Sequence, residues 1–188
     1  MAQRHSIRII GGTWRGRRLP IPAGTKVRPT PDRARETLFN WLSAGVEGTR
    51  CLDLFAGTGA LGFEALSRGA SEALFVENDP RLQAALRDRI ADLEANAKVI
   101  GDDVDKVLSR KCDEPFDLVF LDPPYDDPLE PVLAALPPWL APGAKIYVER
   151  SSSADDALRR LSSAVAGLEL IKESRAGGVR YGLLERAK

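Results

Sequence analysis

The residues with the clearest chemical meaning form the tetrapeptide Asp122-Pro123-Pro124-Tyr125, which follows the apolar run 116–121. Two consecutive prolines fix φ and cannot continue a central strand, so the chain must leave the run in one rigid conformation. The tetrapeptide therefore holds a carboxylate, a backbone carbonyl and an aromatic ring in one preorganised arrangement. Such an arrangement suits a reaction on a planar amine.

An aromatic exocyclic amine is a poor nucleophile because its lone pair is delocalised into the ring. Acceptors on its two N–H bonds favour the geometry in which that lone pair points at an electrophile. We assign this work to the Asp122 carboxylate and the Pro123 carbonyl, and Asp122 can also accept the released proton. Tyr125 is expected to stack on a flipped or unpaired base, a contact worth about 1–3 kcal/mol.

A glycine-rich loop lies upstream of this candidate reaction centre. The segment Gly57-Thr58-Gly59-Ala60-Leu61-Gly62 follows the apolar run 51–55 and has the G-x-G-x-x-G spacing of a nucleotide-binding loop. Glu77 ends the next apolar run, where a carboxylate can bind two ribose hydroxyls. NAD and S-adenosylmethionine would both use these features.

Asp53 separates the two cofactors. An anion before the loop favours the ammonium or sulfonium of S-adenosylmethionine and opposes the pyrophosphate of a dinucleotide. After the third apolar run, 98–100, either Asp102 or Asp103 can accept from the adenine amino group. The spacing to the following apolar residues favours Asp103, and both residues remain candidates.

Short apolar runs alternate with helical patterns, as in a sheet that is covered on both faces. This order predicts a doubly wound, mostly parallel α/β domain, with strands near 51–55, 73–76, 98–100, 116–121 and 145–148, and helices near 60–68, 80–95, 129–136 and 154–165.

A hairpin is expected at each end of the chain. Segments 6–10 and 17–21 form the first, while 167–172 and 179–184 form the second around a glycine turn at 175–178. After the first hairpin, Thr30 is expected to cap a helix, with Pro31 at the first helical position.

The chain has 188 residues, 44% of them hydrophobic, which suits one globular domain with a small appendage. Its zero net charge conceals an asymmetry. Residues 1–35 carry nine basic side chains and one acid, a net charge of +8, so the remainder carries −8. A polyanionic partner is indicated.

Cys51, Cys112 and His5 lie far apart in the sequence. Neither a disulfide framework nor a zinc site is indicated, and no metal is expected. No segment approaches the ~18 apolar residues of a membrane span, and the N-terminal residues lack an apolar signal core. We therefore expect a cytoplasmic protein.

Three motifs within residues 50–125 resemble those of class I amino-methyltransferases: Asp53-Leu54-Phe55-Ala56-Gly57-Thr58-Gly59, Phe75-Val76-Glu77-Asn78-Asp79 and the tetrapeptide 122–125. The N-terminal residues narrow the resemblance. Arg8-Ile9-Ile10-Gly11-Gly12, Arg15-Gly16-Arg17-Arg18-Leu19 and the segment 28–40 are similar to the bacterial family that N2-methylates a guanine of 16S ribosomal RNA. This resemblance implies a seven-stranded Rossmann-like methyltransferase sheet, the methyl donor S-adenosyl-L-methionine, and 16S rRNA within an assembling small (30S) subunit as substrate.

The resemblance also implies roles for individual residues. Cofactor contacts are expected from Asp53, Phe55, Ala56, Gly57, Gly59, Glu77, Asn78, Asp103 and Val104. RNA contacts are expected from Arg4, Arg8, Arg15, Arg17, Arg18, Arg28 and Arg33, with Arg28, Thr30 and Arg33 helping to close the pocket. Residues 1–45 would then form a basic extension and residues 46–188 the methyltransferase domain. Separately, we expect a monomer, because the sequence shows no unexplained apolar face. The family often has one acid where this chain has Asp102-Asp103, which leaves the adenine contact open.

Other functions remain as alternatives. Adenine-N6 methyltransferases of DNA or RNA share the tetrapeptide, although about 45 residues before the first strand leave little room for a DNA-recognition region. Enzymes that methylate protein glutamine have Asn in place of Asp122. A catalytically silent RNA-binding assembly factor would need neither Glu77 nor Asp122. A dehydrogenase would need a hydride-transfer His or Lys that does not follow the glycine loop.

Overall fold

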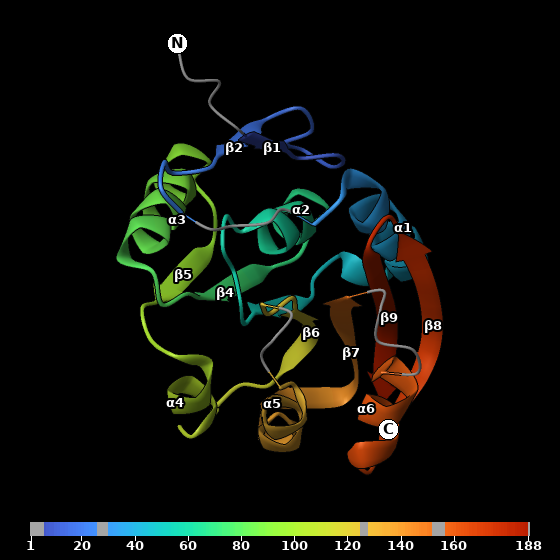
Figure 1. Ribbon diagram of the computed structural model, residues 1–188. Coiled ribbons are helices and arrows are strands. Elements are labelled where there is room, and N and C mark those ends of the chain that lie inside the picture. The colour runs from blue at the N-terminus through green and yellow to red at the C-terminus, as the bar shows by residue number, and fades with distance from the viewer. Residues whose placement is uncertain (1–5, 26–29, 125–127, 152–156, 188) are drawn as a thin grey trace.

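The computed structural model describes residues 6–25, 30–124, 128–151 and 157–187. Three of the expected site residues, Arg4, Arg28 and Tyr125, lie outside the described residues. The central sheet has seven strands in the order β5-β4-β3-β6-β7-β9-β8 (Figure 1). Its strands are β3 Arg50–Asp53, β4 Glu72–Val76, β5 Ala97–Ile100, β6 Phe116–Leu121, β7 Leu140–Ser151, β8 Leu168–Ala176 and β9 Val179–Arg186.

Five of these strands, β5, β4, β3, β6 and β7, pair in parallel, and β9 lies antiparallel between β7 and β8. The predicted mostly parallel, seven-stranded sheet is therefore confirmed. The register places Asp53 beside Phe120 and Leu121 beside Val148. Polar residues that follow these strands consequently meet at one carboxyl edge.

Helices cover both faces of the sheet, with α1, α2 and α3 on one side and α4, α5 and α6 on the other (Figure 1). Each face has its own apolar core, one including Phe63, Phe75 and Phe120 and the other including Val119, Leu133 and Ile146. The helices are α1 Asp32–Leu42, α2 Ala60–Ser67, α3 Pro80–Asp92, α4 Val104–Leu108, α5 Glu130–Ala135 and α6 Ala157–Ala164, with short 3₁₀ turns η1 Ser43–Val46 and η2 Pro137–Trp139.

Several boundaries differ from the predicted ones. Helix α4 was not predicted, because five residues are too few to show a helical period. The C-terminal hairpin pairs as far as Ala176 and Val179, so its turn is confined to Gly177 and Gly178. The N-terminal hairpin is shorter than predicted, with strands β1 Ser6–Arg8 and β2 Arg18–Pro20. None of the helices in the described parts of the chain is long and apolar enough to cross a membrane.

The predicted start of the first helix is wrong by one residue. Pro31, with φ −54° and ψ 140°, is the N-cap residue, and α1 begins at Asp32. The amides of Ala34 and Arg35 donate to the Pro31 carbonyl at 2.9 and 3.1 Å. Thr30 thus lies one residue before the N-cap, and its hydroxyl donates to a carboxylate oxygen of Asp122, at 2.7 Å.

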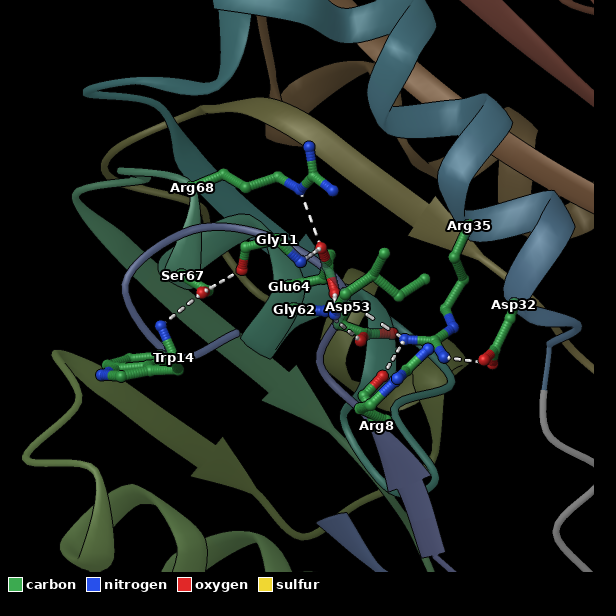
Figure 2. A network of polar contacts seen from close by, with 11 residues as sticks. Arg8, Gly11, Trp14, Asp32, Arg35, Asp53, Gly62, Glu64, Ser67 and Arg68 are labelled. Carbon is green, nitrogen blue, oxygen red and sulfur yellow. Dashed lines mark hydrogen bonds and ion pairs between the residues drawn. The ribbon is translucent and has the colours of Figure 1, made fainter. Parts of the chain in front are cut away.

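One buried carboxylate attaches the N-terminal hairpin to the α/β body of the molecule (Figure 2). Glu64 in α2 is fully buried and accepts the amides of Ile10 and Gly11 at 2.7 and 2.8 Å. Arg68 donates to it at 2.7 Å, and the buried Arg35 guanidinium lies 3.7 Å away. Arg35 also donates to the Arg8 carbonyl at 3.0 Å, which joins α1 to the same network.

Ser67, one turn further along α2, fixes the next residues of the hairpin. Its hydroxyl donates to the Gly11 carbonyl at 2.6 Å and accepts the Trp14 amide at 2.9 Å (Figure 2). A Cβ at Gly12 would lie 1.7 Å from the Ser67 carbonyl oxygen, and its φ is +73°. Only glycine allows this close approach of hairpin and helix.

Replacement of Glu64 tests this attachment. Glu64→Ala should lower the free energy of unfolding by about 3–5 kcal/mol, because buried donors lose their charged acceptor. Urea denaturation measures this change. The exposed Glu36 of α1 provides a matched control, and Glu36→Ala should change stability by less than about 0.5 kcal/mol. A loss below about 1 kcal/mol in Glu64→Ala would contradict the assigned role.

Candidate active site

A cavity of about 800 Å³ opens at the carboxyl edge of the parallel strands. Its size is that of a small-molecule site, and its position is the one at which open α/β sheets bind ligands. The residues expected to act on cofactor or substrate that line it are Asp53, Phe55, Ala56, Gly57, Glu77, Asn78, Asp103, Val104, Asp122, Pro123 and Pro124. The tertiary structure thus brings the glycine loop and the candidate reaction centre into one cavity.

Glu77 is held by backbone donors at the start of the loop. One carboxylate oxygen accepts the Gly57 amide at 2.7 Å, and the other accepts the Asp79 amide at 2.9 Å. Each oxygen has a further lone pair, so the carboxylate is fixed and still able to accept from a ligand. This arrangement fits the binding of two ribose hydroxyls.

Gly59 has a different place from the other expected cofactor residues. It is absent from the cavity lining and acts as the N-cap of α2, with φ +76°. A Cβ at this position would lie 2.7 Å from Leu86 and Phe63. Its contribution in the structure is therefore the turn that starts the helix.

Asp53 is a buried carboxyl group of the cavity whose pKa departs far from its usual range. It is 2% exposed, and the Gly62 amide donates to it at 3.2 Å (Figure 2). Burial raises its pKa to about 7; the Gly62 hydrogen bond opposes this rise, and the charges of Asp122 and Glu77 add to it. A cationic ligand beside Asp53 would favour the ionised form, whereas a pyrophosphate would be repelled.

Asp102 and Asp103 both line the cavity. Hydrogen bonding lowers the pKa of each, chiefly from the Asp103 amide to Asp102 and from Lys106 to Asp103. Asn78 also donates to Asp103, at 3.3 Å. Both residues are thus ionised acceptors near neutral pH, and the assignment of the adenine contact to Asp103 stays a prediction.

The reaction centre contains two further buried groups. Thr30, which was expected to help close the pocket, is 6% exposed, lines the cavity and donates to Asp122. The other group was not assigned to the site from the sequence. Glu149 in β7 is 3% exposed and also lines the cavity. One signal for Glu149 was present, since it directly follows the apolar run 145–148 as Asp122 follows the run 116–121. The neighbouring Tyr147 hydroxyl donates to Glu149 at 3.0 Å.

A second hollow of about 330 Å³ shares Ile7 and Thr30 with the main cavity. Arg8 and Arg18 line it. All the expected RNA contacts among the described residues are exposed, namely Arg8, Arg15, Arg17, Arg18 and Arg33. Arg35 is different, because it is buried against Glu64 and Asp32 and presents no charge to a partner.

Comparison with known proteins identifies the family. The family model described as "Conserved hypothetical protein 95" matches residues 7–185. "Ribosomal RNA small subunit methyltransferase D" of Escherichia coli (strain K12) is 44% identical over 184 residues, 96% of this chain and 90% of the relative. The chain belongs to this methyltransferase family.

Solved structures agree with this membership. The structure of yhhF from Escherichia coli has a TM-score of 0.86 and 42% identity, covering 97% of this chain and 99% of that one. A 16S rRNA N2 G1207 methyltransferase of Thermus thermophilus, solved with AdoMet and guanosine, has a TM-score of 0.74 at 22% identity, covering 99% of this chain and 50% of that one. The second likeness shows the shared methyltransferase fold.

The cofactor of this family is S-adenosylmethionine, and the cavity fits it. Asp53 supplies a buried anion for a cationic ligand, and Glu77 supplies fixed acceptors for ribose hydroxyls. No group of three or more His, Cys, Asp or Glu side chains suited to a metal ion occurs among the described residues.

The raised pKa of Asp53 predicts a pH-dependent cost to stability. The folded protein retains this proton up to about pH 7, whereas the unfolded chain releases it near pH 3.8. Between these values, rising pH therefore lowers the free energy of unfolding by about 1.4 kcal/mol per pH unit through this group. Asp53→Asn should remove that slope, so that the variant is the more stable protein at pH 8.

Denaturation of both proteins from pH 4 to pH 8 measures the difference. The same substitution should weaken S-adenosylmethionine binding, because a neutral amide does not attract a cation. A stability difference that does not grow with pH would refute the assignment of the buried charge to Asp53.

The hydrogen bond from Thr30 predicts that this residue positions Asp122. Thr30→Val keeps the shape of the side chain and removes the donor, so the methyl-transfer rate should fall about ten- to hundredfold. The acid limb of the pH–rate profile should move to higher pH, because the lost bond favours the ionised carboxylate. The matched control, Thr30→Ser, should restore both rate and profile. Equal rates in the valine and serine variants would exclude the positioning role.

Proposed function

We propose that the protein methylates the exocyclic N2 amino group of a guanine in 16S rRNA of the small ribosomal subunit, with S-adenosylmethionine as methyl donor. The observation that carries this proposal is the single cavity that contains Asp53, Glu77 and Asp122. The name of the Escherichia coli relative supports small-subunit ribosomal RNA as the substrate. The tetrapeptide supports an amino group as the acceptor, for the reasons of geometry given above.

Each residue of the cavity has a defined task in this proposal. Bound S-adenosylmethionine supplies an electrophilic methyl group. Glu77 holds the ribose and Asp53 faces the positive charge of the cofactor. Asp122 and the Pro123 carbonyl accept from the amino group and direct its lone pair, and Asp122 stabilises the positive charge that develops on the nitrogen. Tyr125, which lies outside the described residues, is proposed to stack on the base.

Residues 1–45 are proposed to form the RNA-binding extension, and residues 46–188 the methyltransferase domain. The exposed arginines of the hairpin and Arg33 would neutralise phosphates, together with Arg4 and Arg28 from outside the described residues. Each neutralised phosphate would steepen the fall of the logarithm of the binding constant by roughly 0.7–0.9 per log unit of salt concentration. We further propose that the monomeric protein acts in the cytoplasm, on an assembling or assembled 30S subunit.

Two alternatives make different predictions. An adenine-N6 methyltransferase would use the same tetrapeptide, 122–125, to hold a different base. A silent RNA-binding assembly factor would need the basic surface but not the buried Asp53 or the oriented Asp122. The perturbed pKa of Asp53 favours an enzyme, because such groups cluster at sites of chemistry.

Nucleoside mass spectrometry of 16S rRNA tests the proposal. Cells that lack the protein should lose one N2-methylguanine, and the wild-type gene should restore it. Asp122→Ala should fail to restore it while the purified variant still binds S-adenosylmethionine, because the substitution removes the acceptor and leaves Asp53 and Glu77 in place. Loss of an N6-methyladenine instead would overturn the choice of base, and unchanged methylation by Asp122→Ala would overturn the mechanism.

A further inference from the structure

A second buried carboxylate stands beside the reaction centre and has no task in methyl transfer as described above. Strands β6 and β7 pair in parallel with Leu121 opposite Val148, so Asp122 and Glu149 are the next two residues along. Neighbouring strands lie about 4.8 Å apart, and residues two positions apart share a face. Phe120 and Tyr147 belong to the same core cluster, which places Asp122 and Glu149 on the α2 side of the sheet.

The Glu149 side chain is fixed as well as buried. It is 3% exposed, and the Tyr147 hydroxyl donates to one of its carboxylate oxygens at 3.0 Å. Tyr147 is itself fully buried, with its ring centroid 6.0 Å from that of Tyr181. A carboxylate held in this way presents its acceptors to the cavity in a defined orientation.

Each of these side chains already accepts one hydroxyl, from Thr30 to Asp122 and from Tyr147 to Glu149, and a carboxylate has further lone pairs that can accept from a ligand. The standard bases with an exocyclic amine differ in what lies beside it on the Watson–Crick edge. In guanine the N2 amine is flanked by the N1–H donor, whereas in adenine and cytosine the amine is flanked by a ring nitrogen lone pair. Adjacent carboxylates therefore match guanine alone, because a lone pair facing Glu149 would be repelled.

We propose that Glu149 is the residue that selects guanine, by accepting the N1–H while Asp122 accepts from the N2 amino group. This inference rests on the proposed function and adds the chemical basis of its choice of base. Enzymes that flip a base read it through its Watson–Crick edge. A site built to accept a particular N–H discriminates against an analogue that presents a lone pair there, because the two acceptors repel each other.

Binding of two nucleosides to the full-length protein tests the proposal. Guanosine and 2-aminopurine riboside both carry an amine at C2, but N1 of 2-aminopurine bears a lone pair in place of hydrogen. With S-adenosylhomocysteine at saturation, the wild-type protein should bind guanosine at least tenfold more tightly. Glu149→Gln should reduce this preference to within about threefold, since its amide can donate to N1 of 2-aminopurine.

Two further variants serve as controls for the effect of Glu149→Gln. Glu149→Met removes the acceptor without adding a donor, so it should weaken guanosine binding and also lose the preference. Glu185→Gln on β9 changes a carboxylate of the same sheet that is absent from the cavity lining, and it should retain the full preference. Thermal unfolding and S-adenosylhomocysteine affinity should stay close to wild type in every variant that is compared.

The outcomes separate this inference from the proposed function. If the wild-type protein methylates guanine in small subunits but binds the two nucleosides equally, the role of Glu149 is refuted and the proposed function stands. The same conclusion follows if Glu149→Gln keeps the tenfold preference. If the wild-type protein transfers no methyl group to guanine in small subunits from cells that lack it, the proposed function itself fails. The wild-type measurements decide these points even if a variant does not fold.

Discussion

The position of the N-terminal hairpin on the rest of the molecule depends on the hydrogen bonds and ion pairs of the buried Glu64 carboxylate. It accepts two consecutive hairpin amides and the Arg68 side chain, and it faces the guanidinium of Arg35 from α1 (Figure 2). Such a group must be paired when it is buried, so hairpin, α1 and α2 are held together as one unit. The basic segment is thereby a fixed part of the surface beside the cavity.

Helix α2, which carries Glu64, also connects the hairpin and α1 to the cavity. Helix α2 begins at the glycine loop, and its Gly62 amide donates to Asp53. On the other side of the cavity, the hydroxyl of Thr30, just before α1, donates a hydrogen bond to Asp122. The cofactor end and the substrate end of the cavity therefore each receive a hydrogen bond from an element that is bound into the Glu64 network.

The parallel sheet explains why so many acidic groups meet in one place. Strands β3, β4, β6 and β7 end at the same edge, and each contributes a carboxylate there, from Asp53, Glu77, Asp122 and Glu149 respectively. Burial raises the pKa of Asp53 to about 7, and the charges of Asp122 and Glu77 add to this rise. The free protein is less stable because of this raised pKa, and a bound cationic cofactor would offset the cost.

Local patterns in the sequence determined the fold class and half of the site. Alternating apolar runs specify a parallel sheet because its buried strands need apolar residues on both faces, and the glycine spacing with Glu77 specifies a nucleotide loop within one βαβ unit. Only the tertiary structure decided the rest. Thr30 and Asp122 are 92 positions apart, and Glu64 is 53 positions from Gly11, so neither contact leaves a periodic signal in the sequence. Glu149 became visible as a neighbour of Asp122 once the strand register was known, because register depends on packing across the whole sheet rather than on any one segment.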